Sequence, residues 1–261
     1  MINLNKVAYS ICHITNHAYS RMNSYDEANN RLSKMFDSFA PSIAYLKNSE
    51  DFKVLKDKIG CPDIAKYCHQ DLFFVQHDMF YRIGDTAGSS YNNISFPNNF
   101  GQVGLFLSMY QTFKRFLESD YDYLIWMEDD VKLLSNFETN LPYLLNQIDF
   151  EFDFISLGAP ENQMPNYRSE LYDIENKFFC LNFKIYSAES FIFSRAGMEK
   201  FIHEVDTHSY KYPLDWLLFN VRAGENDSAL YKGYSLKPEH SVIGLNFNIG
   251  EEGIIGSTDT L

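Results

Sequence analysis

Three adjacent carboxylates, Glu128, Asp129 and Asp130, are the residues of this chain best suited to chemistry. They follow an uncharged, apolar and aromatic run from Tyr123 to Met127, which predicts a buried strand. Three charges at the edge of a core are unfavourable unless something positive offsets them, and carboxylate oxygens suit Mg²⁺ and Mn²⁺. A metal held by one or two carboxylates keeps open positions for phosphate oxygens. The acids therefore predict a metal-bridged nucleotide site. The alternative is a solvated acidic turn that caps the next helix.

The elements around the acids are expected to alternate between strands and helices. This alternation predicts an α/β fold with a mostly parallel sheet. The expected strands are residues 7–11, 42–46, 123–127, 154–158, 178–185 and 189–194. The expected helices are residues 25–39, 51–59, 62–68, 101–119, 196–205 and 213–221, with a long loop at 81–99 and a break at 160–166.

Several short motifs accompany the acids in a fixed order. They are a helix with Gly101, Gly104 and Ser108, an apolar strand that ends in Ser194-x-x-Gly197, and the sequence Pro213-x-Asp215. With Glu-Asp-Asp-Val at 128–131, this order resembles glycosyltransferase family 25, the lipooligosaccharide galactosyltransferases and their procollagen-modifying relatives. The resemblance covers about residues 98–220. Leu105, Met109 and Met198 depart from the family pattern, which has cysteine, histidine and alanine there.

The resemblance implies a metal-dependent transferase on the GT-A scaffold, with a Rossmann-like sheet flanked by helices. A single domain is expected over residues 1–250, with a nucleotide-binding half at 1–131 and an acceptor half at 132–250. Residues 251–261 lack periodicity and are expected to form a flexible tail.

The resemblance also implies roles around the metal, which would be Mn²⁺ or Mg²⁺. Asp130 is expected to bind it directly, and Asp129 directly or through water. Glu128 would face the ribose or the sugar. His240 would be a late histidine ligand, although a lone histidine is more often structural.

The donor and the acceptor need further residues. In the GT-A scaffold that the resemblance implies, the first strand and its loop contact the base, which implicates Ser10, His13 and Thr15. Arg21 would pair with the diphosphate, unless it is a solvated loop residue. Gln102 stands at a helix start, where backbone amides favour anions.

Asp215 is the candidate general base for an inverting transfer, in which a carboxylate takes the proton of the acceptor hydroxyl. Glu189 and Asp153 are weaker candidates for the same role. The alternative is that Asp215 only interacts favourably with the dipole of the helix it begins.

Composition narrows the possible partners. The chain has 261 residues, 45% of them hydrophobic, which is typical of a globular protein with a substantial core. Its net charge of −13 argues against nucleic-acid binding. The spacing of Cys12, Cys61, Cys68 and Cys180 does not favour a zinc site. The sequence shows no signal peptide and no membrane-spanning run, so a cytoplasmic protein is expected.

The favoured function is transfer of a hexose from a nucleotide-diphosphate sugar, with UDP as the expected nucleotide, to a saccharide or glycoconjugate hydroxyl. The resemblance also implies a role in lipopolysaccharide biosynthesis. One alternative is a metal-dependent phosphoryl- or nucleotidyltransferase, which also uses aspartates to hold Mg²⁺. Another is a carbohydrate-binding protein without catalysis.

Overall fold

The structure is a computed structural model. It describes residues 1–13, 22–39, 42–43, 100–129, 131–158, 176–181, 189–208, 218 and 231–244. The helices expected at 51–59 and 62–68, the segments at 81–99 and 160–166, and the tail at 251–261 lie outside these residues. So does the helix expected at 213–221, apart from residue 218.

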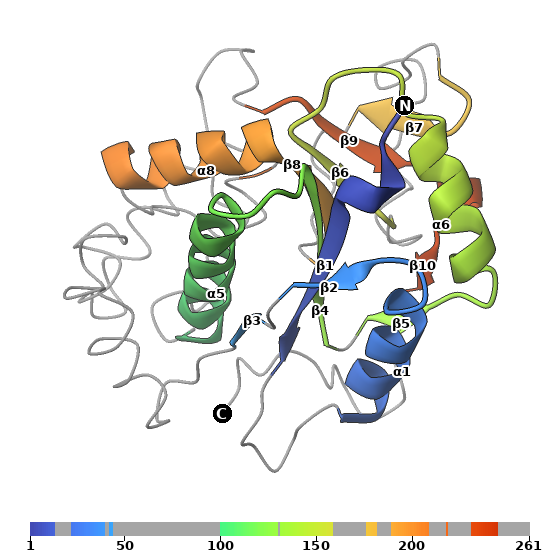
Figure 1. Ribbon diagram of the computed structural model, residues 1–261, viewed down its shortest axis with the longest axis horizontal. Coiled ribbons are helices and arrows are strands. Elements are labelled where there is room, and N and C mark those ends of the chain that lie inside the picture. The colour runs from blue at the N-terminus through green and yellow to red at the C-terminus, as the bar shows by residue number, and fades with distance from the viewer. Residues whose placement is uncertain are drawn as a thin grey trace, which may run out of the picture.

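An eight-stranded sheet lies at the centre of the described chain (Figure 1). Its strands are β1 (Val7–His13), β2 (Asp37–Ser38), β3 (Ser42–Ile43), β4 (Tyr123–Glu128), β6 (Phe154–Ser156), β7 (Phe179–Leu181), β8 (Ser190–Ser194) and β9 (Gly233–Leu236). The spatial order is β2-β1-β4-β8-β6-β9-β7, and β3 pairs with the end of β1. Within this sheet β8 and β7 run against the other strands. The expected α/β fold with a mostly parallel sheet is thus confirmed.

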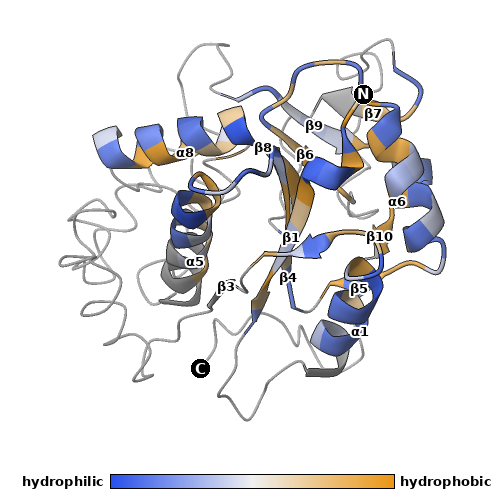
Figure 2. Cartoon of the chain, in the orientation of Figure 1, coloured by the Kyte–Doolittle hydropathy of each residue, from blue (hydrophilic) through white to orange (hydrophobic). Residues whose placement is uncertain are grey.

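Helices cover both faces of the sheet. Side chains alternate along β4, so that Leu124 and Trp126 join one core cluster while Ile125 and Met127 join the other. Helices α5 (Phe100–Phe116) and α8 (Arg195–His208) pack on the first face. Helices α1 (Met22–Leu32) and α6 (Phe137–Asn146) pack on the second. The central strands are accordingly coloured mostly as hydrophobic in Figure 2, whereas the helices show many hydrophilic residues.

Two of the departures from the family pattern belong to this core. Met109 on α5 and Met198 on α8 are fully buried in the cluster between these helices and the sheet. The unbranched methionine side chain adapts to irregular gaps. At these two positions the chain therefore has packing residues.

A small second sheet lies beside the acidic segment. Strand β5 (Lys132–Leu133) pairs antiparallel with β10 (Ile243–Gly244). The chain reaches β10 from β9 through a single 3-10 turn, η6 (Pro238–His240), while another such turn, η1 (Leu4–Lys6), precedes β1. The Val242 amide donates to the Leu157 carbonyl at 3.2 Å, so the segment after β9 crosses the end of β6 on its way to β5.

Most expected elements that fall on described residues are confirmed, but the helix expected at 25–39 is wrong at its end. Helix α1 stops at Leu32, where the Met35 amide bonds to the Leu32 carbonyl in a tighter turn. Asp37–Ser38 then pair with β1 as strand β2. Met35 and Phe36 continue the helical apolar spacing, yet Phe36 reaches the core from the turn. The proposed division into halves at residues 131 and 132 stays a prediction.

The Ser194-x-x-Gly197 motif has a structural explanation where β8 passes directly into α8. The Gly197 amide donates to the Ser194 hydroxyl at 3.0 Å, which caps the helix N-terminus. A Cβ atom on Gly197 would lie 2.1 Å from the carbonyl oxygen of Asp153. The glycine therefore allows the helix backbone to touch the start of β6.

Replacing Gly197 with alanine is expected to lower the free energy of unfolding by about 3 kcal/mol, because the added methyl group collides with backbone that cannot move aside. Urea unfolding measures the change. The neighbouring exposed variant Ala196→Ser serves as the control and should stay within about 0.5 kcal/mol of the wild type. Equal stability of the two variants would contradict the close contact.

None of the helices in the described part of the chain has the length and apolar character needed to span a membrane.

Candidate functional site at the carboxyl ends of β1 and β4

The expected site residues meet where two parallel strands end. In the register of β1 and β4, Cys12 lies opposite Glu128. His13 and Asp129 are the next residue of each strand, so both stand at the same edge of the sheet. Ligands of α/β proteins bind outside the carboxyl ends of parallel strands, which makes this edge the candidate site.

His13 and Asp129 contact each other at this edge. The His13 Nδ1 atom lies 2.9 Å from Asp129 Oδ2, and the two side chains are 6% and 5% exposed. The His13 ring also stacks on Tyr25 of α1, with centroids 4.2 Å apart and planes at 22°. Burial raises the Tyr25 pKa above its ordinary value, with a further contribution from Tyr9 and Asp26. The Tyr25 phenol therefore stays neutral as it packs against the imidazole.

Glu128 lies on the other face of the sheet. It continues the alternation of β4 on the side of Leu124 and Trp126, and it is half-buried. Its amide donates to the Glu189 carbonyl at 2.8 Å. Glu128 and Asp129 therefore lie at the same edge of the sheet but on opposite faces.

The two weaker candidates for a general base lie at opposite edges. Glu189 stands beside Glu128, at the same edge as the acids. Asp153 lies at the start of β6, level with the start of β4. Its carboxylate accepts from the Lys232 amide at 2.7 Å and forms an ion pair with Lys200. The structure thus gives Asp153 a local structural role.

Helix α5 directs its N-terminus at the site. A short connection joins Phe116, the end of α5, to Tyr123 at the start of β4. The helix and the strand therefore run in opposite directions, and the first turn of α5, which contains Gln102, lies toward the carboxyl edge (Figure 1). Free backbone amides at a helix start favour anionic ligands.

The helix that follows the acids does not begin at them. Val131 is followed by strand β5. Helix α6 begins only at Phe137, with Asn136 as its N-cap. The interpretation of the triplet as the cap of the next helix is therefore wrong.

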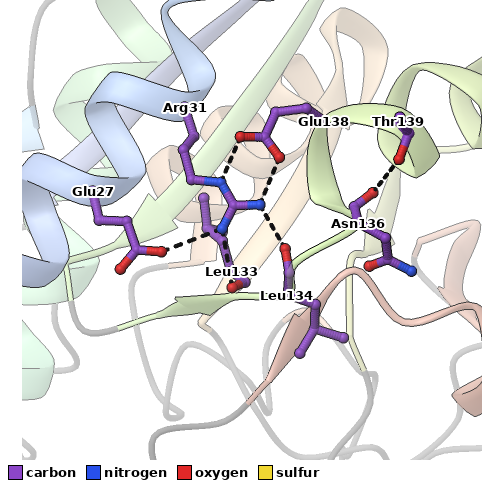
Figure 3. A network of polar contacts seen from close by, with 7 residues as sticks. All are labelled: Glu27, Arg31, Leu133, Leu134, Asn136, Glu138 and Thr139. Carbon is purple, nitrogen blue, oxygen red and sulfur yellow. Dashed lines mark hydrogen bonds and ion pairs between the residues drawn. The ribbon is translucent and has the colours of Figure 1, made fainter.

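Arg31 ties α1 to the segment that follows the acids (Figure 3). Its Nε and Nη2 atoms donate to both carboxylate oxygens of Glu138 at 2.7 and 2.6 Å, and Nη1 reaches Glu27 at 3.2 Å. The same guanidinium donates to the carbonyls of Leu133 and Leu134 at 3.1 and 2.6 Å. Helix α1, which carries Tyr25, is thus fixed to β5.

This network predicts a contribution to acid stability. The hydrogen bonds from Arg31 lower the Glu138 pKa from 4.5 to about 2. Because the pKa is depressed in the folded state, the stabilisation is complete above 4.5 and is lost as the pH falls toward 2. The Glu138 side chain is 34% exposed, so solvent screens the pair, and Glu138→Gln should cost about 1 kcal/mol at pH 7.

Urea unfolding at several pH values measures this effect. The stability difference between the wild type and Glu138→Gln should shrink between pH 4.5 and pH 2. The exposed pair of Lys232 with Glu151 provides the control variant Glu151→Gln, which should have less effect. A difference for Glu138→Gln that does not change with pH would contradict the assignment.

His240 lies apart from Glu128 and Asp129 in the described structure. Its ring packs edge-on against Phe178 beside β7, with centroids 4.9 Å apart. In the antiparallel pairing of β10 with β5, Gly244 lies opposite Lys132, so His240 is on the remote side of that segment. The described structure does not bring His240 together with Asp129, and its role as a ligand stays a prediction.

The remaining candidates divide into two groups. Ser10 is buried within β1, opposite Trp126, three residues before the strand ends. Four candidates lie outside the described residues: Thr15, Arg21, Asp130 and Asp215. Within the part that is described, which lacks Asp130, no three metal-binding side chains cluster.

Sequence reasoning missed two residues of this arrangement. Tyr25 was expected only as the start of a helix, and Arg31 had no expected role. One signal could have identified Tyr25: the first turn of a helix that follows a strand in an α/β fold lies near the carboxyl end of that strand. Glu27 lies four residues before Arg31, at helical spacing, but nothing in the sequence marked the other partners of Arg31, which lie more than 100 residues away.

The geometry defines a mixed α/β protein whose candidate site lies at the carboxyl ends of neighbouring parallel strands. Residues 91–218, just under half of the chain, match the family model described as glycosyltransferase family 25 (LPS biosynthesis protein). The matched range contains the acids, α5 and the Ser194-x-x-Gly197 motif. The resemblance seen in the sequence is thus confirmed, and it supports a glycosyltransferase. None of the curated proteins compared with the chain matches it.

Proposed function

We propose that the protein transfers a hexose from a nucleotide-diphosphate sugar, with UDP as the nucleotide, to a saccharide hydroxyl. The observation that carries the proposal is the placement of Glu128 and Asp129 at the carboxyl edge of parallel strands, in a chain similar to glycosyltransferase family 25. A family of this kind uses nucleotide-sugar donors and saccharide acceptors, and the GT-A scaffold is part of the same proposal.

The donor set fits a divalent metal. Carboxylate oxygens are the ligands preferred by Mg²⁺ and Mn²⁺, and Glu128 and Asp129 stand at the edge of the sheet, where β4 ends. Asp129 and Asp130 would hold the ion, and Asp129 is the one of the two that the structure describes. When bound, such an ion neutralises the charge that develops on the departing diphosphate.

The protein's own groups would bind the donor and move a proton. Glu128 would accept hydrogen bonds from the ribose or the sugar, and the backbone amides at the start of α5 would favour the phosphates. In the transfer, the acceptor oxygen forms a bond to the anomeric carbon as the bond to UDP breaks. The hydroxyl proton passes to a carboxylate, for which Asp215 is the candidate and Glu189 the alternative. Attack from the face opposite UDP inverts the anomeric centre.

A thermal-shift screen of nucleotide sugars with and without Mn²⁺ tests this function. A donor at about a hundredfold excess over its dissociation constant should stabilise the protein by about 2.7 kcal/mol. Turnover of that donor with saccharide acceptors should release UDP. Release of pyrophosphate would indicate a nucleotidyltransferase instead. Glycan binding without any nucleotide effect would indicate a carbohydrate-binding protein.

A further inference from the structure

We infer that His13 is a positioning residue, which holds the Asp129 carboxylate in the orientation needed to bind the metal–nucleotide complex. This inference rests on the proposed function and assigns His13 a role other than the base contact expected from the sequence. His13 would act through Asp129, without touching the donor itself.

The backbone register explains why these two side chains meet. Strands β1 and β4 pair in parallel over six residues, ending with Cys12 opposite Glu128. Both chains then advance by one residue, to His13 and to Asp129. Since side chains alternate along a strand, His13 lies on the face of Tyr9 and Ile11, which α1 covers.

The contact has a defined direction. An ionised carboxylate only accepts hydrogen bonds, so the imidazole donates from Nδ1 to Asp129 Oδ2 across 2.9 Å. Both side chains are more than nine-tenths buried, which excludes competing water from most of their surface. The bond therefore limits rotation of the carboxylate.

The ring itself is held in place. Tyr25 stacks on the imidazole at 4.2 Å, and Arg31 ties the helix that carries Tyr25 to the segment after the acids. A chain of contacts thus runs from α1 through Tyr25 and His13 to Asp129. Partners of metal-binding side chains commonly change metal affinity by 10–100-fold when they are removed.

Two substitutions at His13 separate positioning from packing. In His13→Asn the amide nitrogen is bonded to Cγ, as Nδ1 is in histidine, so it can donate to Asp129 from a similar place. In His13→Leu the apolar volume remains but the donor is lost. Calorimetry of UDP with Mn²⁺ should show a 10–100-fold weaker affinity for His13→Leu and recovery to near wild type for His13→Asn.

Tyr9→Phe is the matched control. Tyr9 lies on the same strand and face, and its hydroxyl donates to Asn29 of α1 at 2.8 Å. The substitution loosens the contact between β1 and α1 without touching the acids. It should lower the melting temperature of the metal-free protein while the affinity for UDP with Mn²⁺ stays unchanged.

The outcomes distinguish the two proposals. Wild-type affinity in His13→Leu, or an equal loss in Tyr9→Phe, would overturn the positioning role while the proposed function stands. Absence of Mn²⁺-dependent UDP binding in the wild type would overturn the proposed function and the inference with it. If His13→Leu does not fold, His13→Gln replaces it. The glutamine amide lies one bond further from the backbone than Nδ1 of histidine, so this variant should not restore the affinity. Equal binding by His13→Gln and His13→Asn would then overturn the inference.

Discussion

Replacing Asp129 with asparagine is expected to weaken Mn²⁺-dependent UDP binding by about 100-fold or more while the fold is retained. The amide is neutral and is a poorer ligand for a hard cation. Its oxygen can still accept the hydrogen bond from His13, so the contact between β1 and β4 survives. Because the carboxylate is a buried charge, its removal should leave the melting temperature of the metal-free protein equal or higher.

Calorimetry with UDP and Mn²⁺ measures this loss. Asp122→Asn is the matched control, because it removes the same charge from an exposed position just before the start of β4. That variant should bind as the wild type does. An affinity within about threefold of the wild type in Asp129→Asn, or the same loss in both variants, would exclude a specific role for Asp129.

Replacing Asp215 with asparagine is expected to lower turnover by about 10²–10⁴-fold without changing donor affinity. The amide fills the volume of the carboxylate but cannot take the proton of the acceptor hydroxyl. If Asp215 only interacts with a helix dipole, the change should instead cost about 0.3–1 kcal/mol of stability with turnover nearly unchanged. Turnover, donor affinity and melting temperature measured on one variant separate these roles.

Asp153→Asn provides the comparison for that experiment. Asp153 pairs with Lys200 and with the Lys232 amide at the far edge of the sheet, so its loss should reduce stability and leave turnover intact. Near-normal turnover in Asp215→Asn would exclude it as the base. Glu189, which lies beside Glu128, would then become the leading candidate.

Local sequence patterns predict the elements that carry the acids. The uncharged run before Glu128 forms β4. The segments before and after it, each with an apolar stripe at helical spacing, form α5 on one face of the sheet and α6 on the other. Side-chain period and turn residues are local properties, so they are visible in one sequence. They also predict that the acids lie at a strand end.

Long-range contacts are not visible in the same way. His13 and Asp129 are separated by 116 residues, and only the pairing of β1 with β4 brings them together. The same holds for Arg31 and Glu138. The end of α1 could not be predicted for a different reason. The apolar spacing continues to Phe36 as it would in a helix, but the next residues pair with β1 and form strand β2.

Paramagnetic broadening by Mn²⁺ tests the position of the site most directly. In NMR spectra of protein labelled at the histidine rings, the His13 signal can be assigned from its absence in His13→Asn. The exposed His203 on α8 provides a reference away from the candidate edge. The proposed site predicts that substoichiometric Mn²⁺ with UDP broadens the His13 signal and leaves that of His203 sharp. A sharp His13 signal at saturating Mn²⁺ and UDP would contradict a metal site at the carboxyl ends of β1 and β4.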